Sequence, residues 1–544
     1  MTDLRAHLKR LEEQGDLVKI SREMNKDTEI HPLVRWQFRG LPESERKAFL
    51  FENVVDSRGR KYNFPVVVGA LSASERIYNT SLGGEDSGER WKHAFDHPIP
   101  PRIVESGPVQ EVVHMGESLL EDGGLDELPV PISTPGFDNA PYFNSAIWIV
   151  RDPETGIMNA GVYRSQIKDQ LRTGIYAFGN NNLARIWEKC NAMGVPLQAA
   201  AVIGADPKIY FSAIQLAAMG VDEMGLAGAL NGSAIEMVRC KTIDLEVPAH
   251  AEIVIEGTIR TDVLEPEGSF GEAHGYSDPR ALGFVFEASC FTHRKNPIYL
   301  SILSQVTPSE SSKSKQSGYE ADALRFLQKE CGLKGVLEVV LVEELMNRQM
   351  AVIRMKKTSP YEPNSALHAL LGRRQPPKFA VAVDEDIDPR DAVAVNWAII
   401  NRCQPHRDVE IVRPRPHPFG PLRLVADDIN YDRYDSSILI DATKKRDLPP
   451  VGLPAKEYME NARKIWEELE MPSLQPRAPW YGYSLGFWPE ESQREAELAT
   501  QGKYFETGEK LSQQQVAVEP GTILAEIRGK WQKEYSVYES IRKK

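Results

Sequence analysis

The stretch Glu267-Gly-Ser-Phe-Gly-Glu272, continued by Ala-His-Gly-Tyr276, places two carboxylates five residues apart with two glycines between them. The run before it, Ala251-Glu-Ile-Val-Ile-Glu-Gly-Thr-Ile259, alternates apolar and polar residues, which predicts a half-buried strand. Pro266 and Gly268 interrupt regular strand pairing. The sequence therefore predicts that both acids lie on an irregular loop beside a sheet.

Two interpretations of this acidic loop are open. A glycine-rich loop lets the backbone approach a ligand closely, and a carboxyl group shielded from water there has a raised pKa. Two carboxylates in unlike surroundings can then divide acid and base work between them. A hairpin with two solvated acids would show the same local pattern. The local sequence alone favours the solvated hairpin, so the rest of the chain has to decide.

Composition narrows the class of protein. The chain has 544 residues, enough for two to four domains, and its contents of 41% hydrophobic and 26% charged residues are typical of globular proteins. The net charge of −13 argues against a nucleic-acid surface or an anionic membrane as partner. Five scattered cysteines argue against a zinc site or a disulfide framework. Because no signal peptide or apolar span is visible either, we expect a cytoplasmic protein.

The pattern of the chain predicts three domains and a tail. A helix is expected over residues 3–14, with Asp3 as its N-cap and Gly15 at its end. Strand-like runs dominate from Tyr142 to about residue 320, and strands alternate with helices from 333 to 445. The proline-rich and acidic segment 95–135 is expected to link the first two domains. The expected units are residues 1–120, 121–330, 331–470 and a C-terminal extension, 471–544, that serves oligomerisation.

Several motifs occur in an order that carries more information than any one of them. Asn159-Ala-Gly-Val-Tyr-Arg164 comes first, followed by Val221-Asp-Glu223, Asp244-Leu-Glu-Val-Pro248 and the acidic loop. Taken together, they resemble the UbiD family of decarboxylases. The resemblance extends to Leu50-Phe-Glu-Asn53 near the start and Asp441-Ala-Thr443 near the end, so that it spans nearly the whole chain.

The resemblance implies a fold, a reaction and a set of partners. The fold would be mixed α/β (α+β): an N-terminal α/β domain, a central split β-barrel like that of flavin reductases, and a C-terminal α/β domain with a helical tail. The reaction would be reversible, non-oxidative decarboxylation of an aromatic, heteroaromatic or α,β-unsaturated acid. The CoA thioester of such an acid is an open alternative as the substrate. The cofactor would be prenylated FMN (prFMN), supplied by a prenyl-FMN synthase, with Mn²⁺ and K⁺ beside it. The assembly would be a homodimer or a homohexamer.

The resemblance also assigns roles to particular residues. Arg164 would meet the substrate carboxylate, Glu267 would pair with Arg164, and Glu272 would deliver the proton after carbon dioxide leaves. The planar guanidinium suits a carboxylate, and a proton donor needs a dry setting that keeps it protonated. Asn159 and Glu223 would be metal ligands. The residues expected to hold the cofactor are Asn159, Gly161, Val162, Tyr163, Arg164, Asn181 and Glu223.

Two positions depart from the family pattern. Many members have a metal-binding histidine soon after the arginine, whereas here the stretch reads Phe178-Gly-Asn-Asn-Asn-Leu183. We assign the third ligand to Asn181, with Asn180 and Asn182 as the other possibilities, because an amide oxygen is acceptable to Mn²⁺. An asparagine turn without any metal contact fits equally well. A family lysine that helps to hold the cofactor is replaced by Ser437, for which Lys444 or Lys445 could substitute.

Other functions stay open on the sequence. The same site could run as a carboxylase, or the chain could be a cofactor-free binding or assembly subunit. His274 could touch the site or be a hydrogen-bonded structural histidine. The acids Asp384-Glu-Asp386 are expected to end a strand and start a helix rather than to bind a metal. Trp480 and Trp488 are expected to be packing anchors of the tail.

Overall fold

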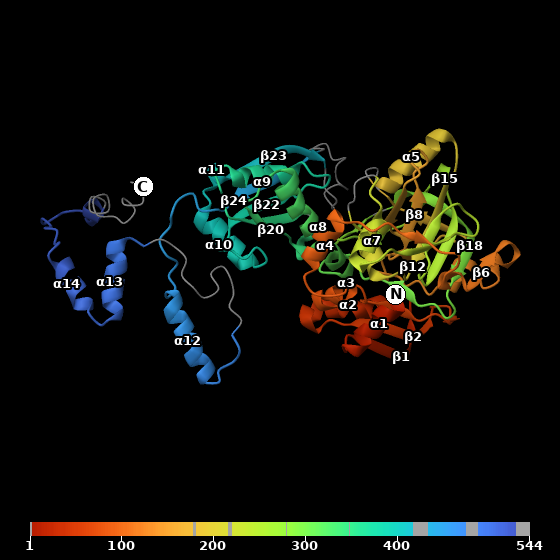
Figure 1. Cartoon of the computed structure of the whole chain (residues 1–544), viewed down its shortest axis with the longest axis horizontal. Helices are drawn as coiled ribbons and strands as arrows, with labels where there is room; N and C mark the ends of the chain where they lie inside the picture. The colour runs from red at the N-terminus through yellow and green to blue at the C-terminus, as the bar shows by residue number, and fades with distance from the viewer. Residues whose placement is uncertain are drawn as a thin grey trace.

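The computed structural model describes residues 3–177, 181–215, 220–278, 280–347, 349–416, 434–474 and 488–528. Its larger sheets follow one another along the chain, and the N-terminal, central and C-terminal parts are distinct in Figure 1. This arrangement confirms the predicted mixed α/β fold. Three helices of the tail lie apart from the three sheets in the same view.

The N-terminal sheet has the order β1-β2-β4-β19, with β3 paired to β2. Helix α1 begins at Leu4 because the Asp3 carboxylate accepts a hydrogen bond of 2.8 Å from the Ala6 N–H, which confirms the predicted N-cap. Strand β19 comes from far along the chain and pairs in parallel with β4. The elements are α1 (Leu4–Glu13), β1 (Leu17–Asn25), α2 (Ile30–Gly40), η1 (Glu43–Glu45), β2 (Ala48–Val55), β3 (Lys61–Tyr62), β4 (Val66–Val68), α3 (Glu75–Leu82), α4 (Ser87–Asp96) and β19 (Tyr299–Ser301).

The central sheet is antiparallel, with the order β11-β18-β15-β12-β8-β9 and β6 paired to β18. Its strands are β6 (Val112–Met115), β8 (Ile147–Arg151), β9 (Met158–Val162), β11 (Arg172–Ile175), β12 (Leu197–Ile203), β15 (Ile253–Glu267) and β18 (Ala281–His293). Shorter strands are β5 (Arg102–Ile103), β7 (Tyr142–Phe143), β10 (Ser165–Gln166), β13 (Glu236–Arg239), β14 (Glu246–Pro248), β16 (Phe270–Gly271) and β17 (Ser277–Asp278). The helices are η2 (Pro108–Gln110), η3 (Gly116–Leu120), η4 (Gly124–Glu127), α5 (Asn182–Met193), α6 (Pro207–Ala213) and α7 (Glu223–Asn231). Strand β6 thus comes from the segment that was expected to be a linker.

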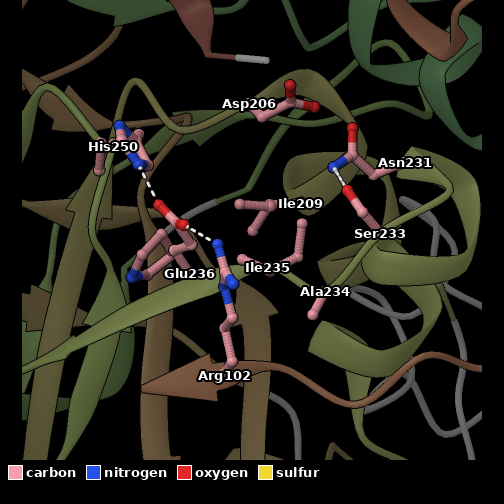
Figure 2. Close-up of a pocket in the computed structure, with 11 residues that line it drawn as sticks. Arg102, Asp206, Ile209, Asn231, Ser233, Ala234, Ile235, Glu236 and His250 are labelled. Atoms are coloured by element: carbon pink, nitrogen blue, oxygen red, sulfur yellow. Dashed lines mark hydrogen bonds and ion pairs between the residues drawn. The ribbon is translucent and has the colours of Figure 1, made fainter. Parts of the chain in front are cut away.

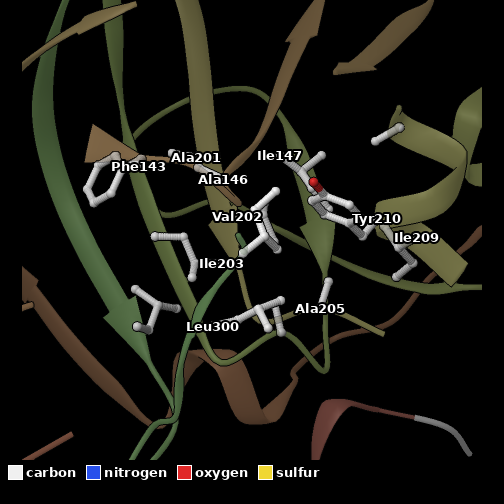
Figure 3. Packing of buried hydrophobic residues seen from close by; sticks show 14 of the residues in the cluster. Phe143, Ala146, Ile147, Ala201, Val202, Ile203, Ala205, Ile209, Tyr210 and Leu300 are labelled. Atoms are coloured by element: carbon white, nitrogen blue, oxygen red, sulfur yellow. The ribbon is translucent and has the colours of Figure 1, made fainter. Parts of the chain in front are cut away.

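Apolar side chains fill the space between the central sheet and α6. Figure 3 shows Val202 and Ile203 of β12 beside Tyr210 of α6 and Leu300 of β19. Every residue of β12 except Gln198 is buried, because the strand has neighbours on both edges and packed layers on both faces. This core joins the N-terminal and central sheets in one hydrophobic cluster.

Strand β15 differs from its prediction in two ways. Residues 253–257 are all buried rather than alternately buried and exposed. Glu256 can be buried because its carboxylate accepts hydrogen bonds of 2.7–2.9 Å from the backbone N–H groups of Lys241 and Thr242 and from the Thr242 hydroxyl. The strand also continues through Pro266 to Glu267, which pairs with Ala281 of β18. Strand β12 ends its pairing at Ile259, so proline interrupts no ladder on that edge. Glu267 is therefore the last residue of a strand, and only Glu272 lies on the loop.

Gly257 lies where the backbone of β18 leaves no room for a side chain on β15. A Cβ atom on Gly257 would collide with the carbonyl oxygen of Glu287 and would lie 2.8 Å from Phe286 Cζ. We expect Gly257→Ala to lower the free energy of unfolding by about 1–3 kcal/mol, because a buried backbone must move to admit the methyl group. Urea unfolding followed by circular dichroism measures this change.

Gly40→Ala is the matched control for that substitution. Gly40 ends helix α2, and no atom lies within 4 Å of the added Cβ. Alanine should leave stability unchanged or raise it by up to about 1 kcal/mol, since it reduces the entropy of the unfolded chain. Equal stabilities of the two variants would contradict the close approach of β15 and β18.

The C-terminal sheet has the order β20-β21-β22-β24-β23 and contains parallel and antiparallel pairs. Asp384 ends strand β22, as predicted, but the next helix begins only at Ala392, with Asp391 as its N-cap. Asp384 and Asp386 instead form buried ion pairs with Arg402 at 2.9 and 2.7 Å. The elements are α8 (Glu310–Arg325), η5 (Phe326–Glu330), β20 (Val336–Leu341), η6 (Glu343–Leu345), β21 (Met350–Met355), α9 (Glu362–Leu371), β22 (Phe379–Asp384), α10 (Ala392–Arg402), α11 (Pro405–Asp408), β23 (Val409–Pro416) and β24 (Tyr434–Asp441).

The tail contributes α12 (Lys456–Glu468), α13 (Glu490–Thr500) and α14 (Tyr504–Ser512), none of which has a buried residue. Trp488 is 41% exposed, so it does not anchor the tail within this chain, and Trp480 lies outside the described residues. The exposed side chains Phe505 and Leu511 fit the prediction that the tail serves oligomerisation, which stays a prediction. Among the helices described, none has the length and apolar character that crossing a bilayer requires.

Candidate active site

Arg164 lies just beyond the end of β9, where the backbone turns from β9 toward β10. Its carbonyl oxygen accepts a hydrogen bond of 3.1 Å from the N–H of Tyr176. Its side chain is buried and reaches the end of β15. The structure therefore brings Arg164 together with Glu267 and Glu272, which follow it by 103 and 108 positions in the sequence.

Two carboxylates share the guanidinium of Arg164. One oxygen of Glu267 accepts hydrogen bonds from Nε at 2.8 Å and from Nη2 at 2.5 Å, and a Glu272 oxygen accepts one from Nη1. Asp278 Oδ2 lies 3.8 Å from the same Nη1. The second oxygen of Glu267 is buried without a hydrogen-bond partner among the described residues. One buried cation thus faces three carboxyl groups, and this excess of negative charge favours protonation of at least one of them.

Aromatic rings fix the plane of the guanidinium. Its central carbon lies 4.2 Å from the ring centre of Tyr176 and 5.3 Å from that of Phe270. The Phe270 ring in turn packs against Tyr142 with ring centres 4.6 Å apart. Cation–π contacts of this kind strengthen when water is excluded. The site therefore offers an oriented positive charge next to flat apolar surfaces.

Burial raises the pKa values of both glutamates. Burial raises the pKa of Glu272, Arg164 opposes this shift, and the nearby Asp278 adds to it. Burial likewise raises the pKa of Glu267, against the opposing charge of Arg164. Although burial disfavours its charge, Glu272 and Glu267 together raise the pKa of Arg164, which stays positive. At least one carboxyl group here is thus disposed to hold a proton at a higher pH than a solvated glutamate.

The glycine between the acids allows the loop to pack tightly. A Cβ atom on Gly268 would collide with the side-chain amide of Asn139. The Gly268 N–H donates to Gln166 Oε1 at 2.8 Å, and its carbonyl oxygen accepts from the Tyr142 hydroxyl at 3.1 Å. The loop is thus held by specific hydrogen bonds, which a solvated hairpin would lack.

A second polar cluster lies on β9 itself. Ala160 donates its N–H to Glu223 Oε2 at 3.0 Å, which places this buried carboxylate at the start of α7 against the strand. Asn159 Oδ1 accepts a hydrogen bond of 2.9 Å from Asn182 Nδ2. Burial raises the pKa of Glu223 to about 8, and it has no ion-pair partner among the described residues. A buried carboxylate with hard amide oxygens beside it fits a divalent cation such as Mn²⁺ or Mg²⁺.

The structure describes the asparagine turn from Asn181 onward. Asn181 is the N-cap residue of α5 and makes no capping hydrogen bond through its side chain. Asn182, one residue later, is the buried one whose side chain meets Asn159. Asn180 lies outside the described residues. The assignment of the third metal ligand to Asn181 stays a prediction, and Asn182 is the neighbour that the structure puts beside Asn159.

The other residues expected to hold the cofactor continue along β9. A Cβ atom on Gly161 would lie 2.6 Å from the Tyr163 ring, so that glycine lets this ring fold back over the strand. The Tyr163 hydroxyl is hydrogen-bonded to the Leu183 backbone and the Asn159 side chain, and burial raises the pKa of Tyr163 to about 12. Val162, the residue between Gly161 and Tyr163 in the chain, is half-buried. Asn159 and Arg164 thus stand at the two ends of one short stretch of chain.

Arg374, from the C-terminal domain, reaches this cluster. Its Nη1 lies 3.4 Å from Asn182 Oδ1. It also lines a cavity of about 660 Å³ between the central and C-terminal domains, together with Gly220, Asp222, Tyr319 and Arg373. Ser437, by contrast, is buried in β24 and donates to the Pro377 carbonyl at 2.8 Å. Lys445 forms ion pairs with Asp441 and Asp408, and Lys444 lies 3.4 Å from Asp386. Both lysines that could replace the family lysine are therefore paired with carboxylates of their own domain.

A smaller cavity of about 310 Å³ lies elsewhere, between β13, α6 and α7 (Figure 2). Figure 2 shows Glu236 between Arg102 and His250. His250 Nε2 donates to one oxygen of Glu236 at 2.7 Å, and Arg102 donates to the other. The charge of Glu236 is therefore balanced within the chain, and this cavity is a weaker candidate for chemistry than the surroundings of Arg164.

Sequence reasoning missed several members of the site. Asp278 and the rings of Tyr176 and Phe270 surround Arg164, and Arg374 comes from another domain. His274 Nε2 donates to Asp278 Oδ1 at 3.2 Å, while its Nδ1 accepts from the Tyr276 N–H. His274 therefore lies one contact away from the arginine. The only sequence signal for Asp278 was its place in the same loop as Glu272.

Family models match the chain in three adjacent blocks. They are described as the N-terminal, Rift-related and C-terminal domains of 3-octaprenyl-4-hydroxybenzoate carboxy-lyase, and they match residues 8–95, 102–306 and 316–442. The fold is therefore that of the carboxy-lyase class. Within that class, the chain belongs to the UbiD family.

Similar proteins agree with this assignment. An uncharacterized protein of Synechocystis sp. is 31% identical, over 82% of this chain and 90% of its own length. The UbiD-class enzyme HmfF of Pelotomaculum thermopropionicum, in complex with prFMN, is 30% identical with a TM-score of 0.73, over 85% of this chain and 100% of its own. Vanillic acid decarboxylase of Sedimentibacter hydroxybenzoicus in its closed form is 26% identical with a TM-score of 0.75, over 86% and 99%.

Proposed function

We propose that this chain binds prFMN and removes carbon dioxide from an aromatic, heteroaromatic or α,β-unsaturated carboxylic acid. The observation that carries the proposal is the buried Arg164, oriented by Glu267 and by two aromatic rings and still shared with Glu272. The arginine fork is suited to a substrate carboxylate, and the rings are suited to an unsaturated, flat substrate. A related structure contains prFMN, which supports the choice of cofactor.

In this proposal, Arg164 binds the substrate carboxylate and orients it. Loss of carbon dioxide from an sp² carbon leaves a carbanion without a resonance sink, and bound prFMN supplies that sink. The incoming carboxylate takes the place of Glu272 at Nη1 of Arg164. Because Arg164 is the group that opposes the raised pKa of Glu272, this exchange favours the protonated acid. Glu272 then protonates the carbon from which carbon dioxide has left.

Glu267 has a different task in the same step. It holds Nε and Nη2 of Arg164 through one oxygen, so that the guanidinium keeps its orientation when Glu272 leaves. Its position at the end of β15, paired to β18, makes it a rigid support. Asp278, near Nη1 of Arg164, and the His274 ring that donates a hydrogen bond to it complete the polar surroundings of the arginine.

The phosphate end of the cofactor would lie at the Glu223 cluster. Glu223 and Asn159 would hold the divalent metal, with Asn181 or Asn182 as a further ligand, and Mn²⁺ suits these oxygen donors. Arg374 would supply the positive charge that Ser437 cannot, because it lies at the same cluster and opens onto the larger cavity. A K⁺ ion at this end stays a prediction.

Reconstitution tests the proposal directly. Protein made together with a prenyl-FMN synthase should retain a flavin-type visible chromophore and release carbon dioxide from at least one acid of a panel of benzoate-type, heteroaromatic, phthalate-type and cinnamate-type acids and their CoA thioesters. Reaction in D₂O should place one deuterium at the carbon that carried the carboxyl group. Chromophore retention without turnover on any acid would refute the proposed reaction, and lack of any chromophore would favour a cofactor-free assembly role.

Arg374→Gln separates cofactor retention from the carboxylate chemistry. The variant should hold less chromophore after gel filtration, because the charge at the phosphate end is lost. Arg407→Gln is the matched control, since Arg407 pairs with Asp408 in the same domain at 2.7 Å. Equal retention by both variants would remove Arg374 from the phosphate site.

A further inference from the structure

A group of metal-ligating side chains lies on the far side of the central sheet from the Glu223 cluster. His114 comes from β6, His293 ends β18 and Glu127 ends η4. Their ring nitrogens and carboxylate oxygens all lie within 4.8 Å of one another. Strand β18 is separated from β9, which carries Asn159, by β15, β12 and β8. At about 4.8 Å per strand, β18 and β9 are about 19 Å apart measured along the sheet.

The imidazoles of this group lack hydrogen-bond partners where they face one another. The residue exposures of His114 and His293 are only 8% and 7%. Both ring nitrogens of His114 and Nε2 of His293 are buried without a hydrogen bond among the described residues. His293 Nδ1 donates to the Arg294 carbonyl at 2.8 Å, which leaves the lone pair on Nε2 facing the group. Metal-binding histidines are commonly oriented by such a backbone contact.

The spacing fits a metal ion better than an ion pair. Glu127 Oε1 lies 3.7 Å from His293 Nε2, which is too long for a hydrogen bond. Asp122 Oδ2 lies 3.4 Å from His114 Nε2 and brings a fourth donor. Ligands at about 2.0–2.2 Å from a tetrahedral zinc ion are about 3.3–3.6 Å apart. The 3.4 Å distance lies in that range and the 3.7 Å distance just above it, while the other donor atoms of His114, Glu127 and His293 lie within 4.8 Å of one another, so that a bound ion would draw them closer.

Neighbouring rings hold the two imidazoles in place. The rings of His114 and His293 are stacked with centres 5.7 Å apart, and Phe64 covers His293 at 5.4 Å.

We propose that His114, Glu127 and His293 bind one Zn²⁺ ion, with Asp122 as the fourth ligand. Four protein ligands leave no open position, so the ion is structural. It ties η4 and the edge strand β6 to the end of β18. The scattered cysteines argued against a thiolate zinc site, and this site uses none. It also differs in kind from the Glu223 cluster, whose donors are all oxygens.

Zinc content and thermal stability test this site in the full chain. The protein is stripped with a chelator, loaded with ZnSO₄ and dialysed, and bound zinc is counted by plasma mass spectrometry. We expect wild type to retain one zinc more per chain than Glu127→Gln and than His114→Gln. Zinc should raise the midpoint of thermal unfolding of the stripped wild type and leave that of Glu127→Gln unchanged. Glutamine keeps the shape of the glutamate, which guards against simple misfolding.

Two controls separate this site from other binding. His368→Gln removes an exposed histidine paired with Glu410 at 2.9 Å, and it should retain zinc as wild type does. Glu223→Gln should also keep this zinc and its stabilising effect. Equal zinc in wild type and Glu127→Gln would overturn the proposal, and so would a loss of zinc confined to Glu223→Gln.

Discussion

Replacement of Glu272 by glutamine is expected to lower turnover of the reconstituted protein by about 10²- to 10⁴-fold, the range typical for loss of a general acid. Glutamine keeps the size of the side chain and can still contact Arg164, but it has no proton to give. The chromophore should be retained, because Glu272 lies at Arg164 and not at the Glu223 cluster. Turnover and the visible spectrum, measured on the same preparation, separate the two effects.

The pH dependence follows from the same carboxyl group. Burial raises the pKa of Glu272, and the protonated form is the one that donates. Activity should therefore be highest below this pKa and fall as the pH rises through it, at a higher pH than an ordinary glutamate would give. In Glu272→Gln, the residual rate should lose this falling limb.

Glu265→Gln is the matched control. Glu265 lies on β15, two residues before Glu267, and pairs with Arg172 at 3.1 Å. It should keep turnover within a few-fold of wild type. Full activity of Glu272→Gln, or an equal loss in both variants, would remove Glu272 from the role of proton donor.

Replacement of Arg164 is expected to have the second large effect, and it should show in both activity and stability. Arg164→Met leaves Glu267 and Glu272 buried without their cation, which costs about 3–5 kcal/mol of unfolding free energy when one partner of a buried pair is removed. Turnover should become undetectable, because the carboxylate of the substrate has lost its partner. Arg164→Lys keeps the charge but not the fork, so kcat/KM should fall by about 10- to 100-fold.

A double variant tells the two effects apart. Adding Glu267→Gln to Arg164→Met removes the unpaired charge, so that part of the lost stability should return while activity stays absent. Chemical unfolding of the four proteins of the cycle measures this coupling. Wild-type stability of Arg164→Met would contradict the buried ion-pair network that the site contains.

Local sequence patterns predict correctly those parts of the fold that depend on contacts between residues close together in the chain. Helix α1 starts at its Asp3 cap as predicted, because the cap and the N–H group it binds are three residues apart. The pattern at 251–259 predicted a strand but misjudged its burial, since the partners of Glu256 come from the 241–242 backbone. The extension of β15 through Pro266 could not be foreseen either, because it depends on where β12 stops.

The site was predictable only where family order carried information that local patterns lack. Nothing near Arg164 in the sequence indicates that its partner is Glu267, and the motifs supplied that pairing. Asn182 is hydrogen-bonded to Asn159, a contact between residues 23 positions apart that no local pattern indicates. Arg374 belongs to another domain, and only the packing of the two domains brings it to Asn182.

Strand β19 has a consequence for the way the protein is made. It pairs with β4, which precedes it by more than 230 residues in the chain. His31 of α2 is hydrogen-bonded through Nε2 to the hydroxyl of Ser301, the last residue of β19, at 2.9 Å. The Glu310 carboxylate then accepts from the N–H groups of Gly69 and Leu71. The N-terminal sheet therefore cannot be completed during synthesis before β19 has left the ribosome. Until then β4 has an unpaired edge, so that the first part of the chain is among the last to complete its fold.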